Sequence, residues 1–155
     1  MTRLGLAVAS VIVIADQVIK WWAIGALGDD PHGVEILPFF NLVLVWNRGI
    51  SFGMFGGGAL PPWLLGAVAL AVTLALVIWL RRVETRLLAA TIGLVIGGAL
   101  GNVIDRFRFG AVADFLDFHW GGYHWPAFNL ADAAISIGVV ILLLDALLIG
   151  DERHK

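Results

Sequence analysis

The longest hydrophobic runs in this chain are two segments near its middle. Residues 61–80 and residues 87–104 contain no charged side chain. A helix needs about 20 consecutive apolar residues to cross the hydrocarbon core of a bilayer. Each run therefore predicts a transmembrane helix.

A further hydrophobic segment lies toward each end of the chain. Residues 4–27 are apolar apart from a few polar positions such as Asp16 and Lys20, and no small-residue cleavage pattern closes the segment early. This pattern favours a retained first helix over a cleaved signal peptide. Residues 130–149 predict a fourth helix, with Asp132 near its start and Asp145 near its end. We expect residues 1–155 to form a single integral membrane domain.

Two segments outside the spans have a different pattern. Residues 35–46 (EILPFFNLVLVW) are rich in β-branched and aromatic residues, which predicts a short strand or hairpin at the membrane interface, although Pro38 weakens a strand locally. Residues 107–128 mix aromatic residues with glycine and proline, as expected for a chain that enters the headgroup layer. The expected fold is an all-α membrane protein of four transmembrane helices, with a small β-rich extracytoplasmic element between helices 1 and 2. Several tryptophans fit an outer aromatic belt: Trp46, Trp63, Trp120 and Trp125.

The composition agrees with a membrane protein and excludes several other classes. Hydrophobic residues make up 60% of the chain and charged residues 14%, against about 45–50% and about 25% in soluble domains. The net charge of −2 includes no basic excess, which argues against a nucleic-acid partner. Because the chain has 0 cysteines, thiol nucleophiles, cysteine metal sites and disulfides are excluded.

The distribution of basic residues predicts the orientation in the membrane. Lysine and arginine concentrate in the N-terminus, the turn at residues 81–86 and the C-terminal tail. The longer connections at residues 28–60 and 105–129 contain only Arg48, Arg106 and Arg108 as basic residues. By the positive-inside rule, both termini are expected to be cytoplasmic and both long connections to face outward.

Most polar groups in or beside the spans are expected at one level, the outer rim of the membrane. A charged residue at the centre of a spanning helix costs about 2.5–3.5 kcal/mol, so each needs a partner or a purpose. The members of this set come from the outer ends of three helices: Asp16, Lys20, Gly101, Asn102, Asp105, Arg106, Asn129 and Asp132. Asp145 lies about 20 Å from Asp132 along the fourth helix and near its cytoplasmic end.

Local spacing also offers a purely structural role for each of these groups. Asp16 and Lys20 stand at i, i+4 in the order that favours an ion pair. Asp105 and Arg106 are suited to cap the third helix or to bind headgroups. Asn129 is a natural N-cap, and Asp132 complements the dipole of the fourth helix. Spacing alone leaves both interpretations open.

Three glycines in the third span are four residues apart. Gly93, Gly97 and Gly101 form a double G-x-x-x-G pattern. In membrane helices this pattern is typical of a surface on which another helix packs closely.

The side chains present in the sequence limit which catalytic mechanisms are available to this chain. All four histidines lie outside the spans, no nucleophile motif surrounds Ser51 or Ser136, and H-E-x-x-H is absent. His119 and His124 with nearby aspartates are a weak metal candidate. A pair of aspartates that shares one proton can activate water and polarise a carbonyl. Asp132 is one natural half, and Asp114, in an apolar setting, is the best suited of the loop acids.

Five short motifs resemble the lipoprotein signal peptidase (signal peptidase II) family. They span residues 16–132, and any one alone would be weak evidence. In chain order they are Asp16-Gln-Val-Ile-Lys20, Asn47-Arg-Gly49-Ile-Ser51-Phe52, Gly101-Asn102-Val-Ile-Asp105-Arg106, Val112-Ala-Asp114-Phe115 and Phe128-Asn129-Leu-Ala131-Asp132.

The resemblance implies a four-helix aspartic peptidase of the bacterial inner membrane, which cuts prolipoprotein signal peptides before an S-diacylglyceryl cysteine. The family's catalytic aspartates fall on Asp114 and Asp132. Its substrate-binding or supporting positions fall on Asp16, Lys20, Asn47, Gly49, Asn102, Asp105, Arg106 and Asn129. We expect a monomer in contact with membrane lipids, with no metal, no other cofactor and no nucleic acid. The expected active site lies near the outer, periplasmic leaflet.

A small transporter or a proton-conducting subunit is the alternative, because intramembrane Asp and Lys residues also mark ion pathways. Such a protein would distribute polar groups through the depth of the membrane. In this sequence they gather at one face, apart from Asp145.

Overall fold

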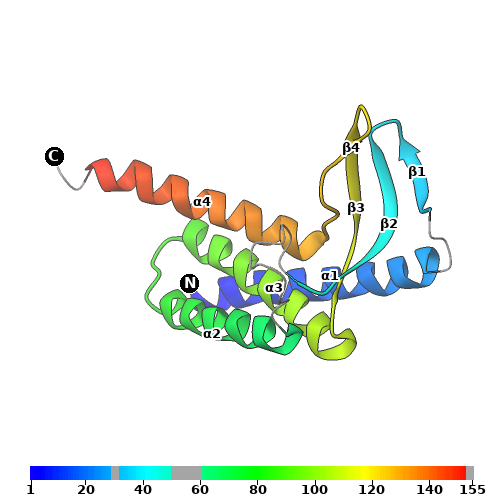
Figure 1. The fold of residues 1–155 in the computed structure, drawn as a ribbon. Coiled ribbons are helices and arrows are strands. Elements are labelled where there is room, and N and C mark those ends of the chain that lie inside the picture. Colours follow the sequence, from blue (N-terminus) through cyan, green and yellow to red (C-terminus); the bar gives the residue numbers. More distant parts are fainter. Residues whose placement is uncertain (29–31, 50–60, 153–155) are drawn as a thin grey trace.

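The computed structural model describes residues 1–28, 32–49 and 61–152. Within these ranges, four helices and four strands follow one another in the order α1-β1-β2-α2-α3-β3-β4-α4 (Figure 1). The helices are α1 (Thr2–Leu27), α2 (Pro62–Leu80), α3 (Arg86–Phe109) and α4 (Leu130–Glu152). The strands are β1 (Val34–Leu37), β2 (Phe40–Asn47), β3 (Val112–Trp120) and β4 (Tyr123–His124). Ile50, Ser51 and Phe52 of the second motif lie outside the described residues.

The four expected spans are present as helices. In the described part of the chain, four helices are long and apolar enough to cross a membrane. The largest difference from the sequence-based boundaries is in α3, which continues beyond residue 104 to Phe109 and ends at Gly110 with φ 66°. A left-handed residue of this kind is a common helix stop. Asp105 and Arg106 therefore lie inside the helix. Of the two structural roles expected for them, capping the helix is wrong, and binding headgroups stays a prediction.

Helix α3 is the centre of the bundle and packs against the other three helices. Its glycine pattern explains how this is achieved. A Cβ atom at Gly97 would lie 2.8 Å from the carbonyl oxygen of Ala9, and one at Gly101 would lie 2.5 Å from Oδ2 of Asp16. Only glycine lets α1 approach this closely, which confirms the packing role expected from the double G-x-x-x-G pattern.

The strands form one antiparallel sheet in the order β1-β2-β3-β4. The hairpin expected at residues 35–46 is confirmed, with its turn at Pro38 and Phe39. Residues 107–128 contain β3 and β4, which sequence analysis did not anticipate as strands. The sheet thus contains strands from both long connections, the one between α1 and α2 and the one between α3 and α4. The buried side chain of Phe115 on β3 packs with Ala23 and Leu27 of α1 and fixes the sheet to the bundle.

The sheet lies at one end of the bundle, and its strands run across the helix axes (Figure 1). The N-terminus and the end of α4 point toward the opposite end. This arrangement brings the start of α4, the end of α3 and the inner end of β3 together.

Candidate active site

Asp114 is held in the buried part of the sheet. It stands on β3 opposite Val45 of β2, and only 2% of it is exposed. Each of its carboxylate oxygens accepts one hydrogen bond from an amide. Asn129 Nδ2 donates to Oδ1 at 2.7 Å, and Asn47 Nδ2 donates to Oδ2 at 3.1 Å. The carboxyl group is therefore fixed in orientation by two neutral donors.

Asp132 is held in the first turn of α4 by a reciprocal cap. The N–H of Asp132 donates to Oδ1 of Asn129 at 2.9 Å, and the N–H of Asn129 donates to Oδ2 of Asp132 at 3.2 Å. The other carboxylate oxygen accepts from Asn102 Nδ2 at 2.7 Å. The expected N-cap role of Asn129 and the expected place of Asp132 in the first turn of α4 are thus confirmed. Asp132 also lies close enough to Asp114 for its charge to act on that group.

Asn129 joins the two acids. Its side chain is fully buried, and its oxygen caps the helix that carries Asp132. Its Nδ2 donates to Asp114 and, at 3.1 Å, to Oδ1 of Asn102. One amide therefore contacts both halves of the candidate pair through its two ends.

The surroundings of Asp114 favour its protonated form. Burial, followed by the negative charge of Asp132, raises the pKa of Asp114 to about 6, against the opposing effects of Asn47, Asn129 and Lys20. Two nearby carboxyl groups, one of which keeps its proton up to about pH 6, are the arrangement that general acid–base catalysis by aspartates needs.

A buried ion triad lies behind the two acids. Lys20 Nζ is 2.9 Å from Oδ2 of Asp16 and 2.8 Å from Oδ2 of Asp105, and all three side chains are at most 2% exposed. Lys20 also donates to Oδ1 of Asn102 at 3.0 Å. The expected i, i+4 ion pair is confirmed, but Lys20 has a second anionic partner from α3.

The two carboxylates of this triad reach the backbone beside the candidate catalytic acids. Asp16 Oδ1 accepts from the N–H of Ala131 at 3.0 Å, and Asp105 Oδ2 accepts from the N–H of Ala113 at 3.2 Å. Ala131 immediately precedes Asp132, and Ala113 immediately precedes Asp114. The triad thus fixes the backbone immediately before Asp114 and immediately before Asp132.

Two further expected residues join the same network. The N–H of Gly49 donates to Oδ1 of Asn47 at 3.1 Å, which orients the Asn47 amide so that its nitrogen faces Asp114. Arg106 Nη1 donates to the backbone oxygen of Asn102 at 3.3 Å, within its own helix. Hydrogen bonds and ion pairs therefore connect all ten of the site residues expected from the sequence.

Gln17 belongs to this network and was missed by sequence reasoning. Its Nε2 donates to Asp105 Oδ1 at 2.9 Å, to Asp16 Oδ2 at 3.2 Å and to the Gly101 oxygen at 3.3 Å. The only signal was its place inside the first motif, Asp16-Gln-Val-Ile-Lys20, which does not by itself assign it a role.

The weak metal candidate is not supported by the geometry. Asp117 contacts His124 Nδ1 at 2.9 Å on the distal part of the sheet, and His119 stacks on His124. Within the described ranges, no three or more His, Cys, Asp or Glu residues form a group that could hold a metal ion.

Comparisons with known proteins give a consistent result. The profile of the family described as Signal peptidase (SPase) II matches residues 8–148. A lipoprotein signal peptidase of Methylorubrum extorquens (strain PA1) is 47% identical over 149 residues, covering 94% of this chain and 86% of that protein. A lipoprotein signal peptidase of Burkholderia thailandensis is 44% identical over 149 residues, covering 92% of this chain and 86% of that protein.

Solved structures extend the likeness to three dimensions. Two structures described as bacterial membrane enzymes match with TM-scores of 0.77 and 0.79, at 32% and 30% identity. The first match covers 97% of this chain and 90% of that one, and the second covers 92% of each. Because the family profile and these relatives match along nearly the whole length, the chain belongs to the signal peptidase II family.

Proposed function

We propose that this chain is a membrane aspartic endopeptidase that removes signal peptides from prolipoproteins, cutting before an S-diacylglyceryl cysteine. The supporting observation is the pair Asp114 and Asp132, which come from a strand and a helix and are held together through Asn129. The substrate class comes from the family and from relatives that are named lipoprotein signal peptidases.

The two aspartates divide the chemistry between them. Asp114 enters the cycle protonated, and Asp132 enters it as the carboxylate. A water molecule attacks the scissile carbonyl carbon, Asp132 takes a proton from that water, and Asp114 gives its proton to the carbonyl oxygen. As the tetrahedral intermediate collapses, Asp132 passes its proton to the leaving nitrogen and Asp114 recovers its own. The enzyme forms no covalent bond to the substrate.

The supporting residues act on geometry. Asn47 and Asn129 hold the carboxyl group of Asp114, and Asn102 holds that of Asp132. The triad of Asp16, Lys20 and Asp105 holds the backbone N–H before each acid. Gly49 orients Asn47, and Arg106 places positive charge beside the pair. Such a rigid frame keeps reacting groups within the narrow tolerances that catalysis requires.

The proposed function also implies a position and an orientation in the membrane. We propose that residues 1–155 form one domain in the bacterial inner membrane, with cytoplasmic termini and the acids near the periplasmic leaflet. The basic turn around Arg81 and Arg82 lies at the end of the bundle away from the sheet, as the positive-inside rule requires. A substrate with two acyl chains beside its scissile bond is held by the bilayer at the depth of these acids. We propose that the enzyme works as a monomer.

The substrate requirement has a direct test. The purified protein is incubated with a precursor peptide that carries a diacylglyceryl cysteine and with the same peptide left unmodified. Only the diacylated peptide is expected to be cut, because only its tails hold the scissile bond at the level of the acids. Equal cleavage of both peptides would contradict the proposed function.

The raised pKa of Asp114 predicts a pH limit on turnover. kcat/KM is expected to fall about tenfold per pH unit above about pH 6, because ionisation of Asp114 in the free enzyme removes the proton for the carbonyl oxygen. Since the folded pKa lies above the ordinary value of 3.8, the same ionisation also lowers stability as the pH rises between about 4 and about 6. Initial rates in buffers of constant ionic strength measure the first effect.

Two asparagines on β2 provide a matched comparison for this limit. The hydrogen bond from Asn47 lowers the pKa of Asp114. Asn47→Leu is therefore expected to shift the falling limb, the part of the pH–rate profile above about pH 6 where activity declines, to higher pH. Asn41 donates in the same way to Asp117, at 3.0 Å, so Asn41→Leu should leave the limb in place. A limb that moves equally in both variants, or in neither, would exclude Asp114 as its source.

A further inference from the structure

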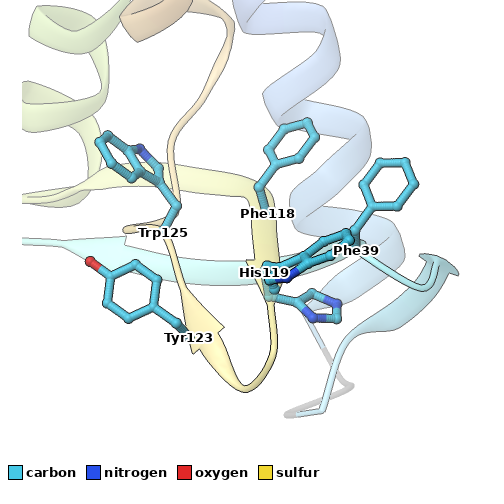
Figure 2. A pocket seen from close by; sticks show the side chains of 6 residues that line it. Phe39, Phe118, His119, Tyr123 and Trp125 are labelled. Carbon is cyan, nitrogen blue, oxygen red and sulfur yellow. The ribbon is translucent and has the colours of Figure 1, made fainter.

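The far end of the sheet carries an exposed cluster of aromatic side chains, which we name the aromatic tip. It surrounds an open basin of about 480 Å³ that is lined by aromatic rings and by the imidazole of His119 (Figure 2). Trp120, Tyr123 and Trp125 are 82%, 70% and 58% exposed, so large rings face outward with little cover from this chain. The members of the aromatic tip are Phe39, Phe118, Trp120, Tyr123 and Trp125.

The aromatic tip is built on a short, well-defined hairpin. Gly121 and Gly122 form a two-residue turn with φ values of 57° and 84°, which pairs Trp120 directly with Tyr123. Turns of this kind match the twist of the flanking strands. At the base of the aromatic tip, Phe118 stacks on Phe128 with ring centroids 5.9 Å apart. The backbone that carries Trp120 and Tyr123 therefore has a defined place on the sheet.

The bundle defines where the aromatic tip lies relative to a bilayer. The four helices set the direction across the membrane, and the strands run across that direction at one end of the bundle (Figure 1). The β3–β4 hairpin extends past α4 at this end of the bundle, so in a membrane it would lie over the lipid beside the helices. Tryptophan and tyrosine are enriched at this depth in membrane proteins, where an apolar ring and a polar edge are both accommodated.

We propose that the aromatic tip rests in the boundary between headgroups and acyl chains and sets the depth of the active site. The occupant of the basin is the bilayer interface. Asp114 and Trp120 belong to the same strand, β3, so an anchor at Trp120 holds the level of Asp114 through continuous sheet. This consequence for catalysis rests on the proposed function, whereas the position of the aromatic tip does not.

The chain is well suited to a direct measurement of depth because it has 0 cysteines. Single variants Trp120→Cys and Tyr123→Cys are labelled with a nitroxide and reconstituted in vesicles of phosphatidylethanolamine and phosphatidylglycerol. Oxygen concentrates in lipid and a nickel chelate stays in water, and both relax the nitroxide by collision. We expect oxygen to dominate at both positions.

Glu35→Cys is the matched control, because Glu35 is exposed on β1 of the same sheet. The nickel chelate should dominate there. A nickel-dominated signal at Trp120 and Tyr123 would place the aromatic tip in water and overturn the proposal. Protection from both reagents, with spin–spin broadening that disappears when labelled protein is diluted with unlabelled protein, would mean that a second copy covers the basin and would also overturn it.

The effect on turnover distinguishes anchoring from a simple structural role. The double variant Trp120→Ser, Tyr123→Ser alters only exposed side chains, so it should insert and fold normally. We expect it to cut the diacylated peptide in vesicles several-fold more slowly, and Trp120→Phe, Tyr123→Phe to restore most of the rate. If the depth measurement succeeds while the serine variant keeps its full rate, the anchor exists but does not set the level of Asp114, and that part of the proposal is wrong.

Discussion

Replacing either Asp114 or Asp132 by asparagine is expected to lower kcat by about 10³-fold or more while the protein still inserts into the membrane. General acid–base groups contribute roughly 10²–10⁴-fold each, and here one acid supplies the proton while the other receives one. Asparagine has nearly the same shape as aspartate but can neither take a proton from water nor be the acid of the pair. Initial rates on the diacylated peptide at saturating concentration measure the loss.

Asp145→Asn is the matched control for both variants. It makes the same change on the same helix as Asp132, but about 20 Å away toward the other end. Its activity should stay close to that of the unchanged protein. Turnover by Asp114→Asn or Asp132→Asn at the level of Asp145→Asn would rule out the two-aspartate mechanism.

The second large effect is expected from the buried triad. Lys20→Met should lower the free energy of unfolding by about 3 to 5 kcal/mol, because it leaves the carboxylates of Asp16 and Asp105 buried without their cation. Activity should fall too, since those carboxylates hold the backbone before both catalytic acids. Denaturant titration in mixed micelles measures the stability.

Two comparisons separate the triad from a general effect of lost charge. Arg82→Met removes a positive charge from an exposed turn and should change stability by less than about 0.5 kcal/mol. The triple variant Asp16→Asn, Lys20→Met, Asp105→Asn removes the whole charge set and keeps an oxygen for each backbone N–H. It should recover much of the stability lost in Lys20→Met. Equal stability of Lys20→Met and Arg82→Met would contradict the account of the triad.

Features that depend on local spacing could be predicted from the sequence. The Asp16–Lys20 pair follows from the helical repeat, and the cap formed by Asn129 follows from its position before an apolar run. The four spans follow from hydrophobic length alone, because no water is available in the membrane to satisfy exposed backbone groups. These predictions did not depend on which distant segments of the chain come into contact in the fold.

Features that depend on distant segments could not be predicted in this way. Strand β3 mixes acids, histidine and aromatics, so its sequence lacks the alternation of apolar and polar residues that marks a strand. It is a strand because it pairs with β2, a segment far away in the chain. The same holds for Gln17, whose partner Asp105 lies 88 positions away in the chain. The links from the triad to Ala113 and Ala131 also depend on tertiary register, which short motifs do not encode.

The central claim is that Asp114 and Asp132 act together on one water molecule. The most direct test is a crystal structure of the protein in lipid at a resolution that shows ordered water. We expect one water within hydrogen-bonding distance of both carboxyl groups, with their nearest oxygens no more than about 5.5 Å apart, the span of two such bonds. Carboxyl groups separated by a larger gap, each with its own water and none in common, would contradict the account.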